Sequence, residues 1–428
     1  MLRITKLGIT KIQASIIALI VIIAVVGVAL YMSMQPTPTL TSTTTLTTTP
    51  SPTPTLTSSP TPKKFRAISY EWVMSLWKNY TKIAPMTPKG PNGEKPSILS
   101  NLTANEIENA KKLQWKDVYY FIATPDPTEL LNMIGMNDVL KQFGVEVKHL
   151  DAWSISEQIG QIEGMIPKAN TVSFVAMEAY EAVSVGPSCV RLADAGVPQV
   201  AVWTTPQGMY NNPNYIGLVD ADGYAQGALS AEMLAYMLNY TGNILIVKFG
   251  LVQWTNVMRY QGAVDTFKKY PGIKIVDEVA FTDVTQVRDL VLAALQAHPE
   301  INGIWATWMI GPATGAAEAV IALGRQKNIV ITAPDLGGLE GAKDIADPNN
   351  PIKGAAEADL ITMGRYMSIA GIKWLLGEKE IHNGYWVAPV YPITRSNLKE
   401  MWYITGNNRY FGDLPQDILK LLEEPWPS

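Results

Sequence analysis

The chain from residue 116 onward alternates between short apolar runs and segments in which apolar residues recur every three or four positions. The strand-like runs lie at 118–124, 145–150, 171–177, 198–204, 244–248, 273–281, 303–307, 329–333 and 386–393. Short strands that alternate with helices are typical of parallel sheets covered by helices on both faces. Two series of similar length meet near Asp220 to Asp222, so the pattern predicts an α/β fold of two Rossmann-like lobes.

Further segments flank the two lobes. A stripe of apolar residues at every fourth position predicts a lead-in helix that packs on the main domain: Ile68, Trp72, Leu76 and Tyr80. We assign the chain to a lead-in (64–115), an N-terminal lobe (116–220 and 360–383), a C-terminal lobe (221–359 and 384–396) and a C-terminal extension (397–428) of unassigned role.

The first 34 residues are typical of a segment that directs export. Arg3, Lys6 and Lys11 precede an uncharged apolar run at 16–32, about as short as a membrane span can be. A retained anchor and a cleaved signal peptide both fit this pattern. The lead-in from Lys6 to Gly8 resembles archaeal pilin-like signal peptides, which keep the apolar helix as an anchor. We therefore expect a cell-surface protein held in the cytoplasmic membrane by its N-terminus.

A stalk is predicted to follow. Residues 35–63 consist almost entirely of Thr, Ser and Pro, which cannot bury enough apolar surface to fold. Their prolines favour an extended conformation of about 3.1 Å per residue, roughly 80 Å in all. Three sequons mark possible N-glycosylation sites, at Asn79, Asn101 and Asn239.

Composition excludes several functions. The net charge of −4 and the absence of a Lys/Arg cluster argue against a nucleic-acid partner. The single cysteine, Cys189, allows no intrachain disulfide and reads as a small buried apolar residue. Three distant histidines make a His-rich metal site improbable. No GxSxG, HExxH or P-loop motif occurs, so we expect neither an enzyme nor a cofactor.

Arg259 is the first candidate binding residue. It lies in the first turns of a predicted helix, just after the apolar strand at 244–248. In open α/β sheets, small ligands bind at the carboxyl ends of the strands. A planar guanidinium offers several donors in a fixed fork, which suits hydroxyls and carboxylates. A solvated helix face remains the alternative for a lone arginine.

Four segments in order give the chain a family resemblance. They are Arg-Tyr-Gln-Gly at 259–262, Leu-Gln-Ala-His-Pro-Glu-Ile-Asn-Gly-Ile-Trp-Ala at 295–306, Ala-Pro-Asp-Leu-Gly at 333–337 and Ala-Asp-Leu-Ile-Thr-Met-Gly at 358–364. From about 116 to 393 the chain resembles type I periplasmic binding proteins, most closely the ribose-binding and related sugar-binding branch. The resemblance implies two lobes joined by three crossovers, near Asp220, Asp359 and Asn383, with the ligand between them.

The resemblance also implies roles for polar residues. An arginine matching Arg259 clamps ring hydroxyls in such proteins, and residues matching Asp335 and Asp359 accept hydrogen bonds. The loop that contains Asp126 lies over the ligand. Physical alternatives stay open: Asp335 precedes two glycines and suits a turn, and Asp359 suits a helix N-cap.

The aromatic residues depart from the ribose-binding pattern. Trp203-Thr204 stands where an Asp-Arg pair is common, and Trp308 stands where Asn-Asp is usual. Trp203, Trp254 or Trp308 are therefore candidates to cover the apolar face of a sugar, with core packing as the alternative for each. These departures affect the expected ligand more than the expected fold.

We expect an extracytoplasmic binding protein that delivers a monosaccharide, a pentose or hexose, to the permease of an ABC importer. We expect it to act as a monomer. The same fold with a nucleoside or autoinducer-type ligand is one alternative, and a sensory receptor ectodomain is another. A glycan-active enzyme using Asp126, Asp335 and Asp359 is a third.

Overall fold

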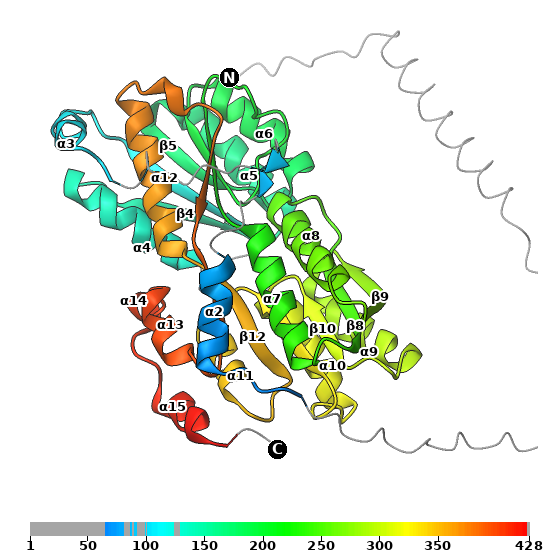
Figure 1. The fold of residues 1–428 in the computed structure, drawn as a ribbon. Coiled ribbons are helices and arrows are strands. Elements are labelled where there is room, and N and C mark those ends of the chain that lie inside the picture. Colours follow the sequence, from blue (N-terminus) through cyan, green and yellow to red (C-terminus); the bar gives the residue numbers. More distant parts are fainter. Residues whose placement is uncertain are drawn as a thin grey trace, which may run out of the picture. The chain divides into compact units, whose positions relative to one another are not determined.

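Two six-stranded sheets, each covered by helices, form two lobes in the computed structural model (Figure 1). The structure describes residues 65–80, 86–87, 90–91, 99, 101–123 and 129–425. The expected anchor (1–34) and stalk (35–63) lie outside these residues. Among the described helices, none combines the length and the apolar character needed to cross a membrane.

The first lobe is built on an all-parallel sheet of order β13-β7-β6-β5-β3-β4. Its strands are β3 (Asp117–Ala123), β4 (Val147–Ala152), β5 (Val172–Glu178), β6 (Gln199–Val202), β7 (Tyr215–Ala221) and β13 (Gly384–Ala388). Its helices are α4 (Glu129–Leu140), α5 (Ile155–Met165), α6 (Ala182–Asp194) and α12 (Leu360–Leu375), with short helical turns η2 (Lys141–Phe143), η3 (Ile166–Thr171) and η6 (Lys379–Ile381).

The second lobe has a sheet of order β14-β12-β11-β10-β8-β9, parallel except for its edge strand β14. Its strands are β8 (Gly242–Phe249), β9 (Ile273–Phe281), β10 (Gly303–Ala306), β11 (Val330–Pro334), β12 (Ile352–Ala358) and β14 (Val390–Thr394). Its helices are α7 (Gly223–Met237), α8 (Trp254–Lys268), α9 (Val287–Ala297), α10 (Thr314–Ala322) and α11 (Gly338–Ala346), with the turns η4 (Val284–Gln286) and η5 (Met309–Ala313).

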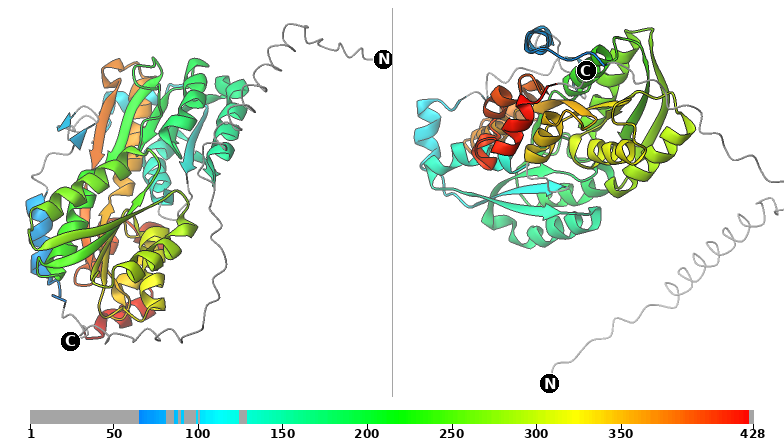
Figure 2. Two further views of the ribbon diagram at one scale, coloured as in Figure 1. Left: turned by 90° about the vertical axis from the view of Figure 1, so that its right-hand side faces the viewer. Right: turned by 90° about the horizontal axis from the view of Figure 1, so that it is seen from below.

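Three crossovers join the lobes, as Figure 2 shows from the side. The first follows β7 at Ala221 and the second follows β12 at Ala358, both where the sequence predicts them. The expected position of the third, near Asn383, is wrong. Strand β13 pairs with β7 in the first lobe, so the chain crosses at Pro389 and only then enters the second sheet as β14.

The apolar run at 386–393 is therefore two strands in different sheets. A single residue separates β13 from β14, so the chain enters the second sheet beside the carboxyl end of β12. From this position the chain can pair with β12 only in the opposite direction, so β14 is antiparallel to β12. Residues 384–388 thus belong to the first lobe and not to the second, where the sequence analysis placed them.

The helices that directly follow the first two crossovers each have an aspartate as their N-cap residue. Asp222 accepts a hydrogen bond from the backbone nitrogen of Ala225 at 2.8 Å and caps α7. Asp359 caps α12 in the same way through Thr362. Each cap satisfies a backbone N–H that has no partner inside the helix. The two helices therefore start at the same place in both lobes, directly after a crossover.

Pairs of glycines let these helices approach their neighbours closely. A β-carbon on Gly227 of α7 would overlap the carbonyl oxygen of Arg259 on α8, and one on Gly262 would overlap that of Tyr224. The first lobe repeats the arrangement where α12 crosses α4, at Gly364 and Gly135. Backbone-to-backbone contact of this kind fixes the position of each helix relative to its partner.

The lead-in and the extension add to both lobes. Ile68, just before helix α2 (Tyr70–Tyr80), and Trp72 within the helix pack on α7, with the Trp72 and Tyr236 rings 3.8 Å apart, as expected for the lead-in. The side chain of Tyr80 lies outside the described part. The other added elements are β1 (Met86–Thr87), β2 (Gly90–Pro91), α3 (Ala104–Ala110), α13 (Leu398–Ile404), α14 (Asn408–Phe411) and α15 (Gln416–Glu423).

Replacing Gly227 by alanine is expected to lower the free energy of unfolding by about 1–3 kcal/mol, because the new methyl group has no room beside Arg259. Gly160→Ala on α5 is the matched control, since no atom lies within 4 Å of its β-carbon position. That variant should gain about 0.5–1 kcal/mol from helix propensity. Urea denaturation measures both, and equal effects would contradict the packing described here.

Candidate functional site

Arg259 lies at the centre of a polar network at the carboxyl edge of the second sheet. It is 4% exposed, and its Nη2 contacts both oxygens of Asp335, at 3.0 and 2.8 Å. Its Nε donates to Gln226 Oε1 at 2.9 Å, and Nη1 donates to the carbonyl of Thr307 at 3.4 Å. The structure thus joins two predicted site residues, Arg259 and Asp335, and excludes a solvated surface position for this arginine.

Gln226 completes this network, and the sequence analysis missed it. Its Nε2 donates to Asp335 Oδ1 at 2.8 Å and to the carbonyl of Ala356 at 3.1 Å. The side chain is fully buried on α7, beneath the arginine and the aspartate. The sequence contained one indication of this contact. Gly223 and Gly227 are four residues apart on α7, and the two glycines flanking Gln226 mark the face of α7 on which α8 lies close.

Trp203 approaches the same arginine from the first lobe. The Arg259 guanidinium carbon lies 5.4 Å from the centre of the Trp203 ring system, which is 5% exposed. Trp203 and Asp335 both have φ of +61°, a left-handed backbone that bulky residues rarely adopt. Such strained positions cluster at functional sites. Here one lies on each lobe, and both border Arg259.

Buried polar groups of the first lobe support Trp203. Its indole nitrogen donates to Glu129 Oε1 at 3.3 Å, and the Tyr120 hydroxyl donates to Glu129 Oε2 at 2.7 Å. Asn132 Nδ2 donates to the same carboxylate at 2.7 Å, and Glu178 lies 3.5 Å from the tyrosine hydroxyl. Complete burial, together with the charges of Glu129 and Glu178, raises the pKa of Tyr120 well above its ordinary value.

Aromatic rings line the second lobe beside the network. Trp308, which follows β10, lies edge-on to Phe249 and Phe281, with ring centres 5.3 and 5.2 Å away. These phenylalanines end β8 and β9, so three neighbouring strands each contribute one ring at the carboxyl edge. The Trp308 indole donates to the carbonyl of Ile310 at 2.8 Å, and the residue is only partly buried.

Trp254 lies at the junction of the lobes. Its backbone nitrogen donates to Thr204 Oγ1 at 3.1 Å, and its side chain packs against the apolar core of the first lobe. A second bond across the junction runs from the backbone nitrogen of Ala182 to the carbonyl of Val252, at 3.2 Å. Trp254 therefore packs at the junction of the lobes, and its contact with a ligand stays a prediction.

The two remaining predicted aspartates differ in what the structure says of them. Asp359 accepts bonds from the backbone nitrogen and the hydroxyl of Thr362, at 3.0 and 2.8 Å, so the N-cap alternative is confirmed. The Tyr391 hydroxyl lies 3.5 Å from the same carboxylate. Burial raises the pKa of Asp359. Asp126 falls outside the described residues, and its role stays a prediction.

Two aspartates flank the first crossover: Asp220 at the end of β7 is fully buried, and Asp222 at the start of α7 is partly buried. Burial raises the pKa of Asp220 well above its ordinary value, although the charge of Arg259 opposes the shift. The Tyr385 hydroxyl donates to Asp220 at 3.2 Å. Burial also raises the pKa of Asp222 to about 6, against the hydrogen bond from Ala225. The neutral form of Asp222 is thus favoured in mildly acidic solution.

The other candidate chemistry gives no site. Burial raises the pKa of Cys189 to about 12, which fits the predicted apolar role. No cluster of three metal-ligating side chains occurs among the described residues. Asn79, Asn101 and Asn239 are all exposed, and their glycosylation stays a prediction.

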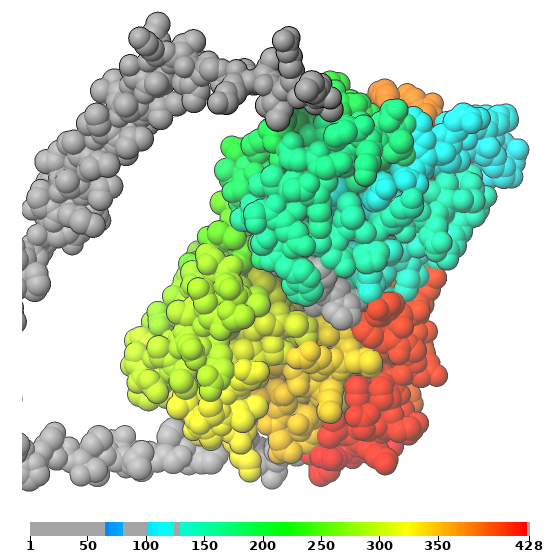
Figure 3. Space-filling model, turned by 180° about the vertical axis from the view of Figure 1, so that it is seen from behind, coloured from blue at the N-terminus to red at the C-terminus, as the bar shows by residue number. Residues whose placement is uncertain are grey.

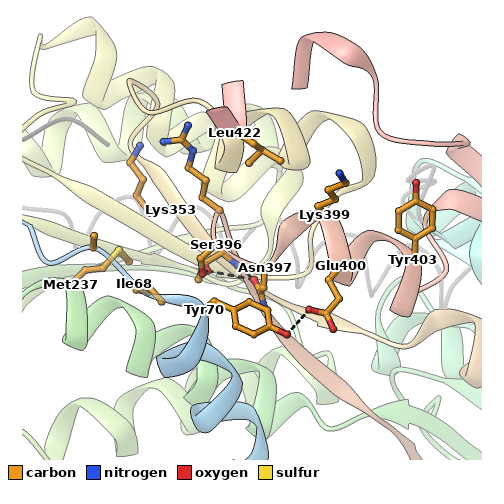
Figure 4. A pocket seen from close by; sticks show the side chains of 13 residues that line it. Ile68, Tyr70, Met237, Lys353, Ser396, Asn397, Lys399, Glu400, Tyr403 and Leu422 are labelled. Atoms are coloured by element: carbon orange, nitrogen blue, oxygen red, sulfur yellow. Dashed lines mark hydrogen bonds between the residues drawn. The ribbon is translucent and has the colours of Figure 1, made fainter. Parts of the chain in front are cut away.

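A cavity of about 760 Å³ lies at the opposite end of the second lobe (Figure 4). Met237 and Lys353 line it, at the ends of α7 and β12 that are farthest from the crossovers. Tyr70 closes one side by donating to Glu400 at 2.7 Å. None of the predicted site residues takes part in it.

Asp222→Asn should change the pH dependence of stability. The raised pKa means that the folded chain binds this proton more tightly, so stability is highest at low pH and falls as pH rises from about 4 to 6. Asparagine keeps the cap but not the titration. Wild type should therefore lose about 2 kcal/mol relative to the variant between pH 4 and 7. Denaturation curves at each pH test this, and parallel profiles would contradict it.

Comparison with known proteins agrees with this architecture. The family model described as a periplasmic binding protein domain matches residues 133–341. The xylitol-binding protein of Mycolicibacterium smegmatis is 28% identical over 143 residues, which cover 33% of this chain. The chain matches only 39% of the length of that relative.

Solved structures share the fold at low identity. An ABC transporter solute-binding protein from Bacillus halodurans, solved with myo-inositol, has a TM-score of 0.57 at 21% identity and covers 67% of this chain and 96% of its own. One from Agrobacterium vitis, bound to alpha-D-tagatopyranose, has a TM-score of 0.59 at 19% identity, with 67% and 97% covered. Both of these proteins are described as ABC transporter solute-binding proteins. The described residues therefore have the two-lobed fold of type I periplasmic binding proteins, and residues 133–341 are similar to the family described as a periplasmic binding protein domain.

Proposed function

We propose that the chain is the extracytoplasmic sugar-binding protein of an ABC importer and encloses a monosaccharide or related polyol between its lobes. The observation that supports this best is the buried network of Arg259, Asp335 and Gln226, which faces Trp203 of the other lobe. The matched proteins, whose descriptions name xylitol, myo-inositol and tagatose, point to the same class of ligand.

The network suits hydroxyl recognition. Arginine has five N–H donors, and the four contacts made by Arg259 leave at least one for a ligand. Asp335 is about one quarter exposed, so its carboxylate can accept from a sugar hydroxyl while it pairs with Arg259. A polyol that lacks the matching hydroxyl would leave the remaining N–H of Arg259 without a ligand partner, which makes such a site selective.

The rings supply the apolar part of the site. A pyranose or furanose has a C–H face that packs on aromatic rings. We assign this role to Trp203 from the first lobe and to Trp308 from the second, with Asp126 and Asp359 as further polar contacts. Ligand contacts from both lobes exist only when the lobes are together, so binding selects the closed arrangement.

The apolar segment at 16–32 and the stalk at 35–63 support tethering at the cell surface. A tethered monomer of this kind would present the closed lobes to a permease. The rings of Phe249, Phe281 and Trp308 favour one alternative ligand, a nucleoside or another furanose with an apolar substituent. A sensory ectodomain of the same fold would bind its ligand by the same contacts.

Ligand-dependent thermal unfolding tests the proposal. The panel includes arabinose, xylose, ribose, glucose, galactose, tagatose, xylitol, myo-inositol and several nucleosides. A ligand at a hundred times its Kd adds about 2.7 kcal/mol of stability, so its melting shift is measurable. We expect a shift with at least one sugar or polyol and its loss in Arg259→Met.

Arg325→Met is the matched control for that variant. Arg325 is a half-buried arginine of the same lobe that donates to the carbonyls of Leu295, Pro299 and Ile301, away from the network. Its loss should lower stability and keep the ligand shift. A shift with nucleosides alone would reject the sugar proposal and favour the alternative ligand.

Gln226→Leu should weaken binding without touching the ligand. It removes the partner of Arg259 Nε and one partner of Asp335, so both lose their fixed orientation. Gln158→Leu is the control, because this buried glutamine also makes two hydrogen bonds, to Glu178 and Tyr180 of the first lobe. Calorimetry should give a Kd about tenfold higher for the Gln226 variant, corresponding to about 1.4 kcal/mol. Equal affinities would show that Gln226 does not position the pair.

A further inference from the structure

The C-terminal extension is fixed to the second lobe. Trp402 of α13 is fully buried in the core of that lobe, and the ring of Phe411 packs on Gly338. Asn407, also fully buried, donates to Glu357 of β12 at 3.4 Å. The short helix α14 is therefore held by the second lobe and must move with it.

Helix α14 forms an ion pair with the first lobe through Arg409. Arg409 Nη1 donates to Asp138 Oδ2 and Nη2 donates to Oδ1, both at 2.7 Å. Asp138 lies on α4, so this two-pronged ion pair joins the extension to a helix of the opposite lobe. Figure 3 shows the red extension running along the second lobe and meeting the first. Paired N–H···O bonds of this kind require a fixed relative orientation of the two groups.

The receiving carboxylate is prepared within the first lobe. Arg365 of α12 donates to Asp138 Oδ2 from both Nη2 and Nε, at 2.8 and 3.2 Å. The hydrogen bonds from Arg409 and Arg365 hold the pKa of Asp138 below its ordinary value. Beside this pair, Gly406 turns the extension with φ of +77°, and a β-carbon there would collide with Ile361 of α12.

We propose that α14 is a latch that stabilises the closed arrangement of the two lobes through the Arg409–Asp138 pair. The lobes of this fold move about their crossovers. Because α14 moves with the second lobe and α4 with the first, their ion pair can form only while these faces are together. The latch depends on the fold and the extension, and not on the identity of the ligand.

The geometry sets the size of the effect. The side chains of Arg409 and Asp138 are 38% and 25% exposed, so water screens their attraction. Exposed pairs of this kind change an equilibrium by about two- to fivefold. The latch therefore shifts the balance between open and closed lobes and still allows a ligand to enter and leave.

Double electron–electron resonance on the full chain without ligand tests the latch. Spin labels at Ser156→Cys on α5 and Asp289→Cys on α9 report the distance between the lobes, since both positions are exposed. The native Cys189 is fully buried. In Arg409→Gln and in Asp138→Asn, the ratio of closed to open lobes should fall about two- to fivefold, and the double variant should show no further loss.

Arg365→Gln is the matched control. It removes the same kind of bond to the same carboxylate, but from a helix of the same lobe as Asp138, so the distance distribution should stay closer to wild type. The Asp138 substitution lies on α4 and changes no residue of the extension. It therefore shows whether an effect of the Arg409 variant comes from the lost ion pair or from detachment of α14 from the second lobe. Unchanged distributions in both would overturn the latch. Because no sugar is present, this result is independent of whether the chain binds one.

Discussion

The close contact between α7 and α8 is the constraint on which the candidate site depends. Gly227 and Gly262 bring the two backbones together, so the first turns of α8 rest on α7 directly after the crossover. This places Arg259 above Gln226 and beside Asp335. The same contact recurs in the first lobe between α12 and α4. In each lobe, a helix that arrives through a crossover packs by glycine on the helix that follows the first strand of that lobe: α7 on α8, and α12 on α4.

The site combines contributions that neither lobe makes alone. The second lobe supplies a compact ionic network, in which buried Arg259 is paired and hydrogen-bonded as a buried charge requires. The first lobe supplies Trp203, held by the carboxylate of Glu129. Left-handed backbone at Trp203 and Asp335 is costly, and the surrounding bonds maintain it at the point where the lobes face each other.

The lead-in and the extension are parts of the folded protein. The lead-in packs Trp72 on α7, and the extension buries Trp402 in the second core. About a third of the chain has no aligned counterpart in the solved structures described above, which are themselves almost completely covered. Arg409 of the extension contacts Asp138 of the first lobe, so this added segment contacts both lobes.

Hydrophobic periodicity predicted two α/β lobes that meet near Asp220 to Asp222, because strand and helix periods depend on local backbone geometry. The crossover near Asp359 was expected from the family resemblance. Arg259 was a candidate because it closely follows a strand, and Asp335 because it matches a residue of the family that the chain resembles. The third crossover was not predictable, since the run that contains Pro389 reads as one strand although its halves pair with different sheets. Gln226 and Glu129 look like ordinary helical residues in the sequence. Only tertiary packing brings them to their partners, because contacts between distant segments leave no local periodic signal.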